Sequence, residues 1–118
     1  MDSAACYEYE LEYAVPGTSR SAYEDWLTRA TVSWGMDARV RSLSHQETDT
    51  RFTPYERLVF EFESVHEWAG FVESQTHTEN VSELRELATE IRTRLWRPRR
   101  AGRLTRSTAA VTAAAEDR

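Results

Sequence analysis

Lysine is absent from this sequence of 118 residues, and cysteine, proline and glycine are scarce. Because Cys6 is the single cysteine, no disulfide can form within the chain. The four glycines build no glycine-rich phosphate loop, and no pair of histidines has the spacing typical of a metal site. No N-terminal stretch resembles a signal peptide, and no segment approaches the ~20 apolar residues of a membrane span. We therefore expect a cytoplasmic protein with no metal, no nucleotide and no membrane partner.

Charge and aromatic content narrow the class of protein further. The 20 acidic residues outnumber the 15 basic ones, all of them arginine, and the net charge is −5. Because no basic stripe runs through the folded part, we expect no nucleic acid as the main partner. Four tryptophans, five tyrosines and four phenylalanines are typical of one globular domain, in which they supply core or line an apolar pocket.

The stretch RLVFEFESVHEWAGFV, residues 57–72, predicts a strand followed by a helix. Apolar and polar residues alternate from Leu58 to Phe62, which is the period of a half-buried strand. Ser64 stands three residues before Glu67, the spacing of a capping box, in which the hydroxyl accepts from a first-turn N–H group. Apolar residues then recur at helical spacing, so we expect the helix to begin after Ser64.

The N-terminal half predicts a strand, a helix and a second strand. Strict alternation runs from Cys6 to Val15 and indicates the first strand. Ser21 and Glu24 form a second capping box that begins a helix, and Gly35 is placed to end it in a left-handed conformation. A weaker alternation predicts a strand over 38–46, and the polar segment 47–55 predicts a mobile hairpin connection to the strand at 57–63.

The C-terminal half predicts an interrupted helix and one more strand. The helix that begins at residue 65 is expected to break in the polar run 74–80 and to resume as far as about residue 91. Alternation over 92–97 before Pro98 predicts a short edge strand. Residues 99–118 are expected to form a disordered tail, so the folded domain is 1–98.

This β-α-β-β-α-β order predicts an α+β, ferredoxin-like fold, a four-stranded antiparallel sheet with both helices on one face. Aromatic and aliphatic side chains of the strands face the helices. The opposite face carries Glu8, Glu10, Glu12, Glu61 and Glu63 with Arg39, Arg41, Arg57, Arg92 and Arg94. Carboxylates of the first strand are expected to pair with arginines of its neighbours. This face is either solvated or matched against a second copy in a dimer.

The run RLVFEFESVHEWAGFVES, a polar turn containing His77, the segment ELRELA and the final RLWRP together resemble the dimeric α/β-barrel superfamily. Its members include antibiotic-biosynthesis monooxygenases, small polyketide cyclases and NIPSNAP-like proteins. The resemblance covers residues 6–98 and implies a homodimer whose two sheets form a barrel, with an apolar pocket between sheet and helices in each subunit. It also implies catalysis without metal or organic cofactor, although some relatives bind haem.

Tyr9, His77 and His66 are the candidate catalytic residues. A buried tyrosine hydroxyl needs a hydrogen-bond partner, and Tyr9 sits centrally on the first strand. Histidine is the side chain whose ordinary pKa suits proton transfer near neutrality. In a continuous helix His77 faces solvent, opposite Trp68, whereas a break at 74–80 frees it to turn toward the pocket. The alternative for both histidines is an exposed surface position.

Aromatic side chains at helical spacing predict the wall of a substrate-binding pocket. They are Tyr23, Trp26, Trp34 and Trp68, joined by Phe60 from the sheet. The alternative is that these rings are plain core.

Two classes of function remain open. The first is a cofactor-independent enzyme of natural-product biosynthesis that acts on an aromatic or polyketide-like small molecule, with cyclisation ranked above oxygenation. The second is a non-catalytic dimeric protein that binds a ligand, and haem binding is a weaker third hypothesis. A ligand-sized cavity reached by a histidine discriminates the first class from the second.

Overall fold

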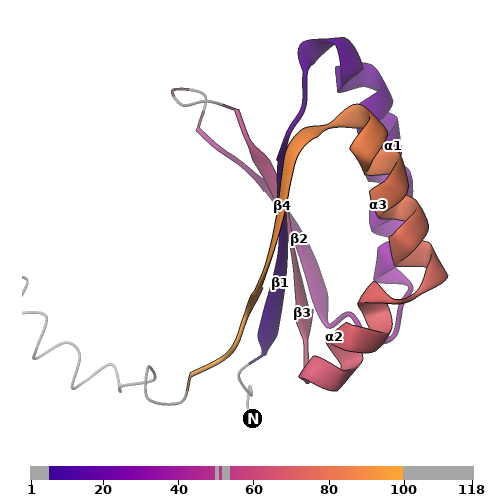
Figure 1. Ribbon diagram of the computed structural model, residues 1–118, viewed down its shortest axis with the longest axis vertical. Helices are drawn as coiled ribbons and strands as arrows, with labels where there is room; N and C mark the ends of the chain where they lie inside the picture. The colour runs from indigo at the N-terminus through magenta and orange to yellow at the C-terminus, as the bar shows by residue number, and fades with distance from the viewer. Residues whose placement is uncertain (1–5, 50, 52–53, 100–118) are drawn as a thin grey trace, which may run out of the picture.

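The computed structural model describes residues 6–49, 51 and 54–99. Its elements follow the predicted order, with the second helix divided into two (Figure 1). They are β1 (Tyr7–Ala14), η1 (Gly17–Ser19), α1 (Arg20–Gly35), β2 (Ser42–Glu47), β3 (Glu56–Phe62), α2 (Val65–Val72), α3 (Gln75–Leu87) and β4 (Thr89–Trp96). Apart from Arg99, the predicted tail lies outside the described residues, as does part of the predicted 47–55 connection. Within the described residues, no helix combines the length and the apolar character needed to cross a membrane.

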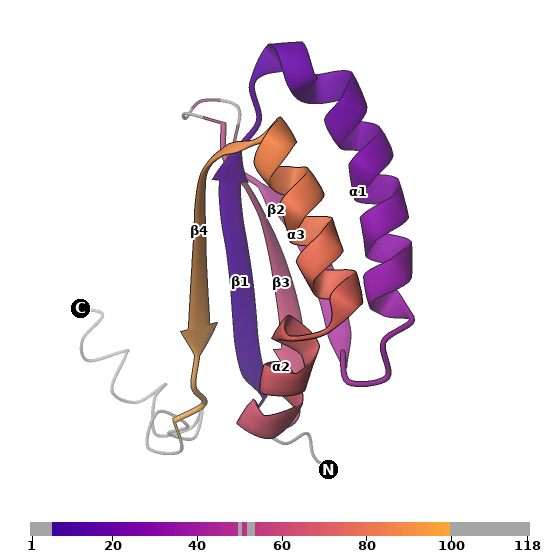
Figure 2. The same ribbon diagram turned by 45° about the vertical axis from the view of Figure 1, so that its right-hand side comes forward.

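The four strands form one antiparallel sheet in the order β2-β3-β1-β4. This is the ferredoxin-like arrangement, so the predicted fold class is confirmed. The helices lie on one face of the sheet, with α1 and α3 side by side and α2 near one end (Figures 1 and 2). β1 is a central strand, and β2 and β4 are the two edges.

The core lies between the sheet and the helices, as the alternation of β1 and β3 predicts. Tyr9 lies opposite Phe60 of β3 and Leu95 of β4. Side chains that face the helices exclude solvent, and those without exposed surface are Leu11, Tyr13, Tyr23, Trp26, Trp34, Leu58, Phe60, Phe62, Phe71 and Leu84. Several of the rings expected to line a pocket are therefore closely packed.

The opposite face of the sheet carries the predicted ion pairs around Glu10. This carboxylate is buried, because Arg94 approaches it to 2.9 Å and Arg57 to 3.6 Å and the Trp96 indole N–H donates to it at 3.0 Å. Arg94 also reaches Glu12 at 3.4 Å. The prediction that carboxylates of the first strand pair with arginines of neighbouring strands is confirmed for these two residues.

The capping box predicted at Ser21 and Glu24 is wrong, because α1 begins earlier. Its N-cap residue is Ser19, and the turn η1 runs directly into the helix, so that the Arg20 N–H bonds to the Gly17 carbonyl. The preceding turn thus satisfies a donor that a capping side chain would otherwise satisfy.

The prediction that Gly35 ends the helix in a left-handed conformation is also wrong. Gly35 is the last helical residue, and no glycine among the described residues has a positive φ. Met36 follows in right-handed conformation and donates its N–H to the carbonyls of Ser33 and Trp34, which ends α1 by a tight turn.

The prediction that Arg39 and Arg41 lie on the open face of the sheet is wrong, because β2 begins only at Ser42 and Arg41 lines a cleft between α1 and β2. Residues 37–41 form a loop in which Asp37 accepts from both the backbone N–H and the guanidinium of Arg39, each at 2.9 Å. The guanidinium lies against α2, so close that a Cβ added at Gly70 would come within 2.7 Å of it. Asp37 therefore directs Arg39 to the helical side.

The break between α2 and α3 falls at the start of the predicted segment and is shorter than expected. The Ser64 hydroxyl accepts from the Glu67 N–H, as predicted, and α2 ends at Val72. Ser74 then caps α3, which includes the polar run that was expected to interrupt the helix. Because Ser74 offers its own hydroxyl to the new helix, two residues suffice for the change of direction.

Candidate functional site

A cleft of about 330 Å³ opens between the β1–β4 side of the sheet and α3. Its lining residues are Tyr9, Leu11, Val72, His77, Thr78, Val81, Arg85, Ile91 and Thr93. The aliphatic members make an apolar floor, and the polar groups come from few positions. Both leading catalytic candidates, Tyr9 and His77, are among them.

His77 reaches the cleft because of the way α3 begins. The Ser74 hydroxyl accepts from the His77 backbone N–H at 3.2 Å and donates to the Phe71 carbonyl at 2.7 Å. The cap places His77 in the first turn of α3, with only 5% of its surface exposed. Val81 and Arg85 follow at intervals of four, so the three side chains share one face of the helix.

His77 and Tyr9 form a pair of neutral groups. The Tyr9 hydroxyl and the His77 Nε2 atom are 3.3 Å apart, a long hydrogen bond. Burial lowers the pKa of His77 to about 4 and raises the pKa of Tyr9, an effect that the charge of Arg85 partly offsets. At neutral pH the imidazole is therefore an unprotonated base and the phenol keeps its proton.

Aromatic rings surround this pair. The centroid of His77 lies 4.6 Å from Phe71 and 5.7 Å from Trp34, and Tyr9 lies 6.1 Å from Trp68. The His77 Nδ1 atom and the indole nitrogens of Trp34 and Trp68 are buried and have no hydrogen-bond partner among the described residues. Such atoms are costly in an apolar environment and are typical of functional sites. The ring of Phe60 lies 6.4 Å from His77. Phe60, Trp34 and Trp68 pack behind the pair, and none of the three lines the cleft, although they were predicted to do so.

The structure places three predicted site residues elsewhere. Trp26 is buried between α1 and α3, where its indole N–H donates to the Asn80 carbonyl at 3.1 Å. Tyr23 stacks on Trp26 at 5.6 Å and directs its hydroxyl to a different polar cluster. His66 lies exposed in the first turn of α2 and lines no cleft among the described residues. None of these three residues lines the Tyr9–His77 cleft, so the roles predicted for them there have no support from its geometry.

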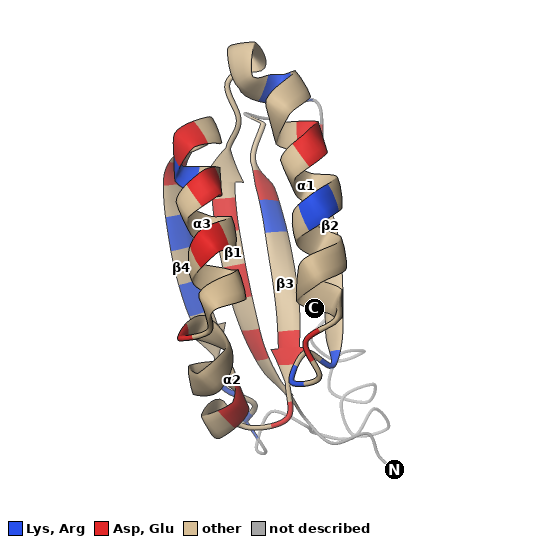
Figure 3. Ribbon diagram, turned by 90° about the vertical axis from the view of Figure 1, so that its right-hand side faces the viewer, with Lys and Arg blue, Asp and Glu red and all other residues tan. Residues whose placement is uncertain are grey.

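Arg85 is the main cleft residue that sequence reasoning missed. It makes no ion pair with any described residue, although α3 also carries Glu79, Glu83 and Glu86 (Figure 3). Because of these neighbouring glutamates, the sequence pattern indicates that Arg85 belongs to a solvated face of the helix. Its spacing of eight from His77 was the available signal, because two turns of helix return a side chain to nearly the same face.

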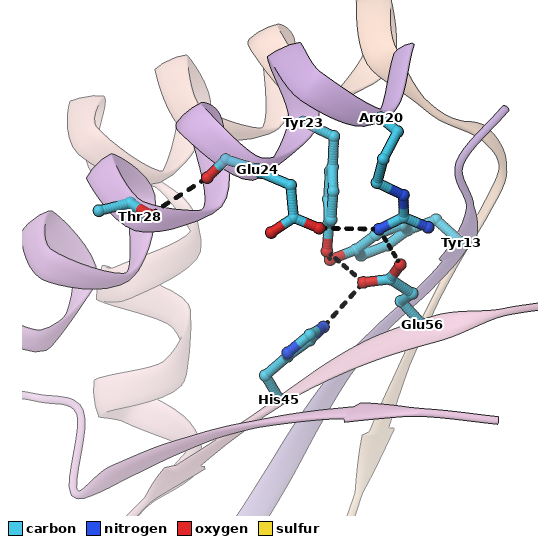
Figure 4. A network of polar contacts seen from close by, with 7 residues as sticks. All are labelled: Tyr13, Arg20, Tyr23, Glu24, Thr28, His45 and Glu56. Atoms are coloured by element: carbon cyan, nitrogen blue, oxygen red, sulfur yellow. Dashed lines mark hydrogen bonds and ion pairs between the residues drawn. The ribbon is translucent and has the colours of Figure 1, made fainter. Parts of the chain in front are cut away.

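A second polar cluster centres on Glu56, the first residue of β3 (Figure 4). Its carboxylate is 4% exposed and accepts from the Tyr23 hydroxyl at 2.7 Å and from His45 Nε2 at 2.8 Å. Arg20 approaches the other oxygen to 2.7 Å. Since Tyr23 donates its one hydrogen to Glu56, the Tyr13 hydroxyl donates to Tyr23, over 2.6 Å.

These contacts keep Glu56 ionised. Burial alone raises the pKa of the carboxyl, but hydrogen bonds from Tyr23, His45 and Arg20 outweigh that effect and hold the pKa below its ordinary value. Burial also raises the pKa of Tyr13 and of Tyr23. No sequence pattern predicts this cluster, because Glu56 follows a polar segment whose composition indicates a connection.

In the described residues, no group of three or more His, Cys, Asp or Glu side chains is placed to hold a metal ion. The polar groups of the Tyr9–His77 cleft are instead a base, hydroxyl donors and one guanidinium. Such a set can bind an organic molecule, accept a proton from it and stabilise negative charge on its oxygen.

Comparison with solved structures places the chain among proteins of the ferredoxin-like fold that includes antibiotic-biosynthesis monooxygenases. One similar structure is Rv0793 from Mycobacterium tuberculosis, with a TM-score of 0.70 and 14% identity over 80% of this chain and 96% of that one. Another is SnoaB, a cofactor-independent oxygenase from Streptomyces nogalater, with a TM-score of 0.68 and 11% identity over 82% of this chain and 96% of that one.

A structure described as an antibiotic biosynthesis monooxygenase has a TM-score of 0.68 and 5% identity, over 79% of this chain and 98% of that one. No protein-family model matches the chain, and the comparison with curated proteins gives no match. At these identities the similarity establishes the fold that the chain shares with these proteins.

Proposed function

We propose that this protein is a cofactor-independent enzyme of small-molecule metabolism that removes a proton from an activated carbon of an aromatic or polyketide-like substrate. The observation that carries the proposal is the His77–Tyr9 pair in the cleft, 3.3 Å apart. A non-catalytic core has no need for an unprotonated imidazole and a phenol at the edge of a ligand-sized cleft. The cavity thus supports the enzyme hypothesis over a purely structural role.

His77 acts as the base. Among the described residues, its Nε2 atom is engaged only by the long contact with Tyr9, and a substrate oxygen that accepts from Tyr9 releases this nitrogen. An imidazole with a pKa of about 4 is a weak base toward a neutral ligand. The charge of an enolate beside it raises that pKa as the proton moves, so base strength increases where it is needed.

Tyr9 and Arg85 stabilise the enolate oxygen. The phenol stays protonated because burial raises its pKa, so it can donate a hydrogen bond to a developing oxyanion. Arg85, without an ion pair among the described residues, provides the compensating charge at the same cleft. The apolar floor positions the hydrocarbon part of the substrate.

Oxygenation is the outcome that we favour after deprotonation. The enolate gives electrons to O₂, and the balanced reaction converts a CH₂ group beside a carbonyl into a second carbonyl, with one O₂ consumed and one H₂O formed. The sequence alone ranked cyclisation above oxygenation, and the similarity to the oxygenase SnoaB supports the reverse order. In a cyclase the same enolate attacks a second carbonyl of the substrate and no O₂ is consumed.

The test uses 2-tetralone, a bicyclic ketone whose C1 hydrogens lie between a carbonyl and an aromatic ring. We expect the full chain to accelerate exchange of these hydrogens in D₂O, measured by mass spectrometry, and to consume O₂ in step with product. Exchange should fall at least about 100-fold in His77→Ala, the scale of general-base catalysis, and remain in His66→Ala. Exchange that is equal in both variants contradicts the proposal, and exchange without O₂ uptake favours cyclisation.

A further inference from the structure

We infer that the chain has a second ligand site, between α1 and β2, for a straight amphipathic carboxylate that carries a hydrogen-bonding oxygen at its far end. A cleft of about 390 Å³ lies there, lined by Thr31, Gly35, Val40, Arg41, Ser42, Leu43, Ser44 and His45. It shares no lining residue with the Tyr9–His77 cleft. Because β2 and β4 are opposite edges of the sheet, the two clefts lie on opposite sides of the molecule.

Several residues that line the second cleft follow one another along the edge strand β2 and the residues just before it. Leu43 pairs with Phe60 and His45 with Leu58, whose side chains face the helices, so Leu43 and His45 point to the helical side. Arg41 directly precedes the strand and lines the same cleft. Leu43 and Val40 are half-buried against the core and form an apolar floor. Arg41 and His45 stand at its two ends, about 13 Å apart along the strand.

The charges around this cleft favour an anion. No aspartate or glutamate of the described part of the chain lines it. The Arg41 guanidinium is exposed and makes no ion pair with any described residue, unlike Arg39 beside it, which binds Asp37 at 2.9 Å. A carboxylate at the Arg41 end would therefore meet an unopposed positive charge, with which it can form two parallel hydrogen bonds.

His45 supplies the second recognition element, and Glu56 orients it. Because Glu56 is ionised and can only accept, the His45 Nε2 atom donates to it over 2.8 Å. The other ring nitrogen, Nδ1, makes no hydrogen bond to a described residue. A buried carboxylate that holds an imidazole in one orientation at a cleft is a typical second-layer support for a binding group. Glu56 is thus a positioning residue for this site.

These features define the ligand by length and by polarity. Its carboxylate binds Arg41, its chain lies along Leu43 and Val40, and its far oxygen meets His45. Medium-length hydroxy or oxo carboxylic acids have this form, since eight carbons span most of the distance between the two ends.

The experiment titrates the ¹⁵N-labelled full chain with octanoate, 8-hydroxyoctanoate and 1-octanol, and follows amide shifts. We expect saturable shifts at residues 31–45 with both acids and weaker binding of the alcohol, which lacks the charge. In Arg41→Gln the Kd for octanoate should rise at least about tenfold. Arg92→Gln, an exposed arginine on the opposite edge strand, is the matched control and should leave it unchanged.

The His45 end is tested by the difference between the two acids. 8-Hydroxyoctanoate should bind about three- to tenfold more tightly than octanoate, and this gain should vanish in His45→Leu and persist in His66→Leu. Shifts confined to residues 72–93, equal affinity for octanol and octanoate, or an unchanged Kd in Arg41→Gln would each overturn the second site. The Arg41→Gln result decides the question by itself if His45→Leu loses its fold.

Discussion

At the residue scale, Tyr9 contributes both a packed ring and a hydroxyl to the Tyr9–His77 cleft, and one substitution separates the two. Tyr9→Phe keeps the ring contacts with Phe60 and Trp68 and removes only the donor to the oxyanion. We expect the rate of 2-tetralone exchange to fall about 100-fold, with the free energy of unfolding changed by about 1 kcal/mol or less. Exchange kinetics and urea unfolding of the same samples check both halves. A rate equal to that of the parent chain would contradict the assignment.

The burial of His77 predicts a dependence of stability on pH. Its pKa is lowered from 6.5 to about 4 on folding. Between these values the unfolded chain takes up a proton that the folded chain excludes, so the free energy of unfolding falls as pH decreases through this window and its His77 contribution levels off below it. The loss is about 3 kcal/mol.

The measurement is urea unfolding at several pH values from 7 to 4. His77→Gln should show a shallower decline than the parent chain, because glutamine does not titrate. His66→Gln, at an exposed position, should keep the parent slope. Parallel curves for all three proteins would show that His77 titrates normally.

At the element scale, the junction of α2 and α3 determines whether the site exists. Ser64 and Ser74 cap the two helices in the same way, each accepting from the N–H three residues on, at 3.1 and 3.2 Å. Only the second cap holds His77. Both alanine variants should lose about 1 kcal/mol of stability, but only Ser74→Ala should also reduce exchange activity by more than the loss of folded protein explains. If both variants reduced activity equally, the Ser74 cap would have no specific role in positioning His77.

A feature of the fold could be predicted from the sequence where the interactions that cause it lie within a few residues of one another. The alternation in β1 and β3 and the hydroxyl of Ser64 act within a few residues, and the structure confirms them. The extent of β2 and the start of α1 depend on contacts that the pattern does not contain, namely the Asp37–Arg39 pair and the turn η1. Local chemistry was therefore sufficient for element order and insufficient for element ends.

The two clefts show the same limit. His77 and Tyr9 could be singled out because buried titratable groups are rare and chemically distinctive. Arg85 could not, since its meaning depends on which face of α3 meets the sheet. The Glu56 cluster joins residues from β1, α1, β2 and β3, from Tyr13 to Glu56, 43 positions apart, and no spacing in the chain indicates such a contact.

At the scale of the whole molecule, the open face of the sheet raises the question of oligomeric state. It combines the buried Glu10, its arginine partners and Trp96, which is 54% exposed. Val59 lies half-buried in the middle of β3 on this side and lines a shallow, mainly polar hollow of about 370 Å³. Rows of both charges on one face are complementary to themselves under a two-fold rotation, the usual geometry of a homodimer.

We therefore propose that two copies associate through this face, as the resemblance to dimeric α/β barrels implied. Light scattering should give twice 13.7 kDa for the parent chain. Val59→Arg should shift the mass to that of the monomer, because an unpaired charge enters the centre of the interface. Val32→Arg, at a position 61% exposed on α1, should remain dimeric. A monomeric parent chain, or a dimer indifferent to Val59→Arg, would exclude the open face as the interface, and the Tyr9–His77 cleft would then have to function within a single subunit.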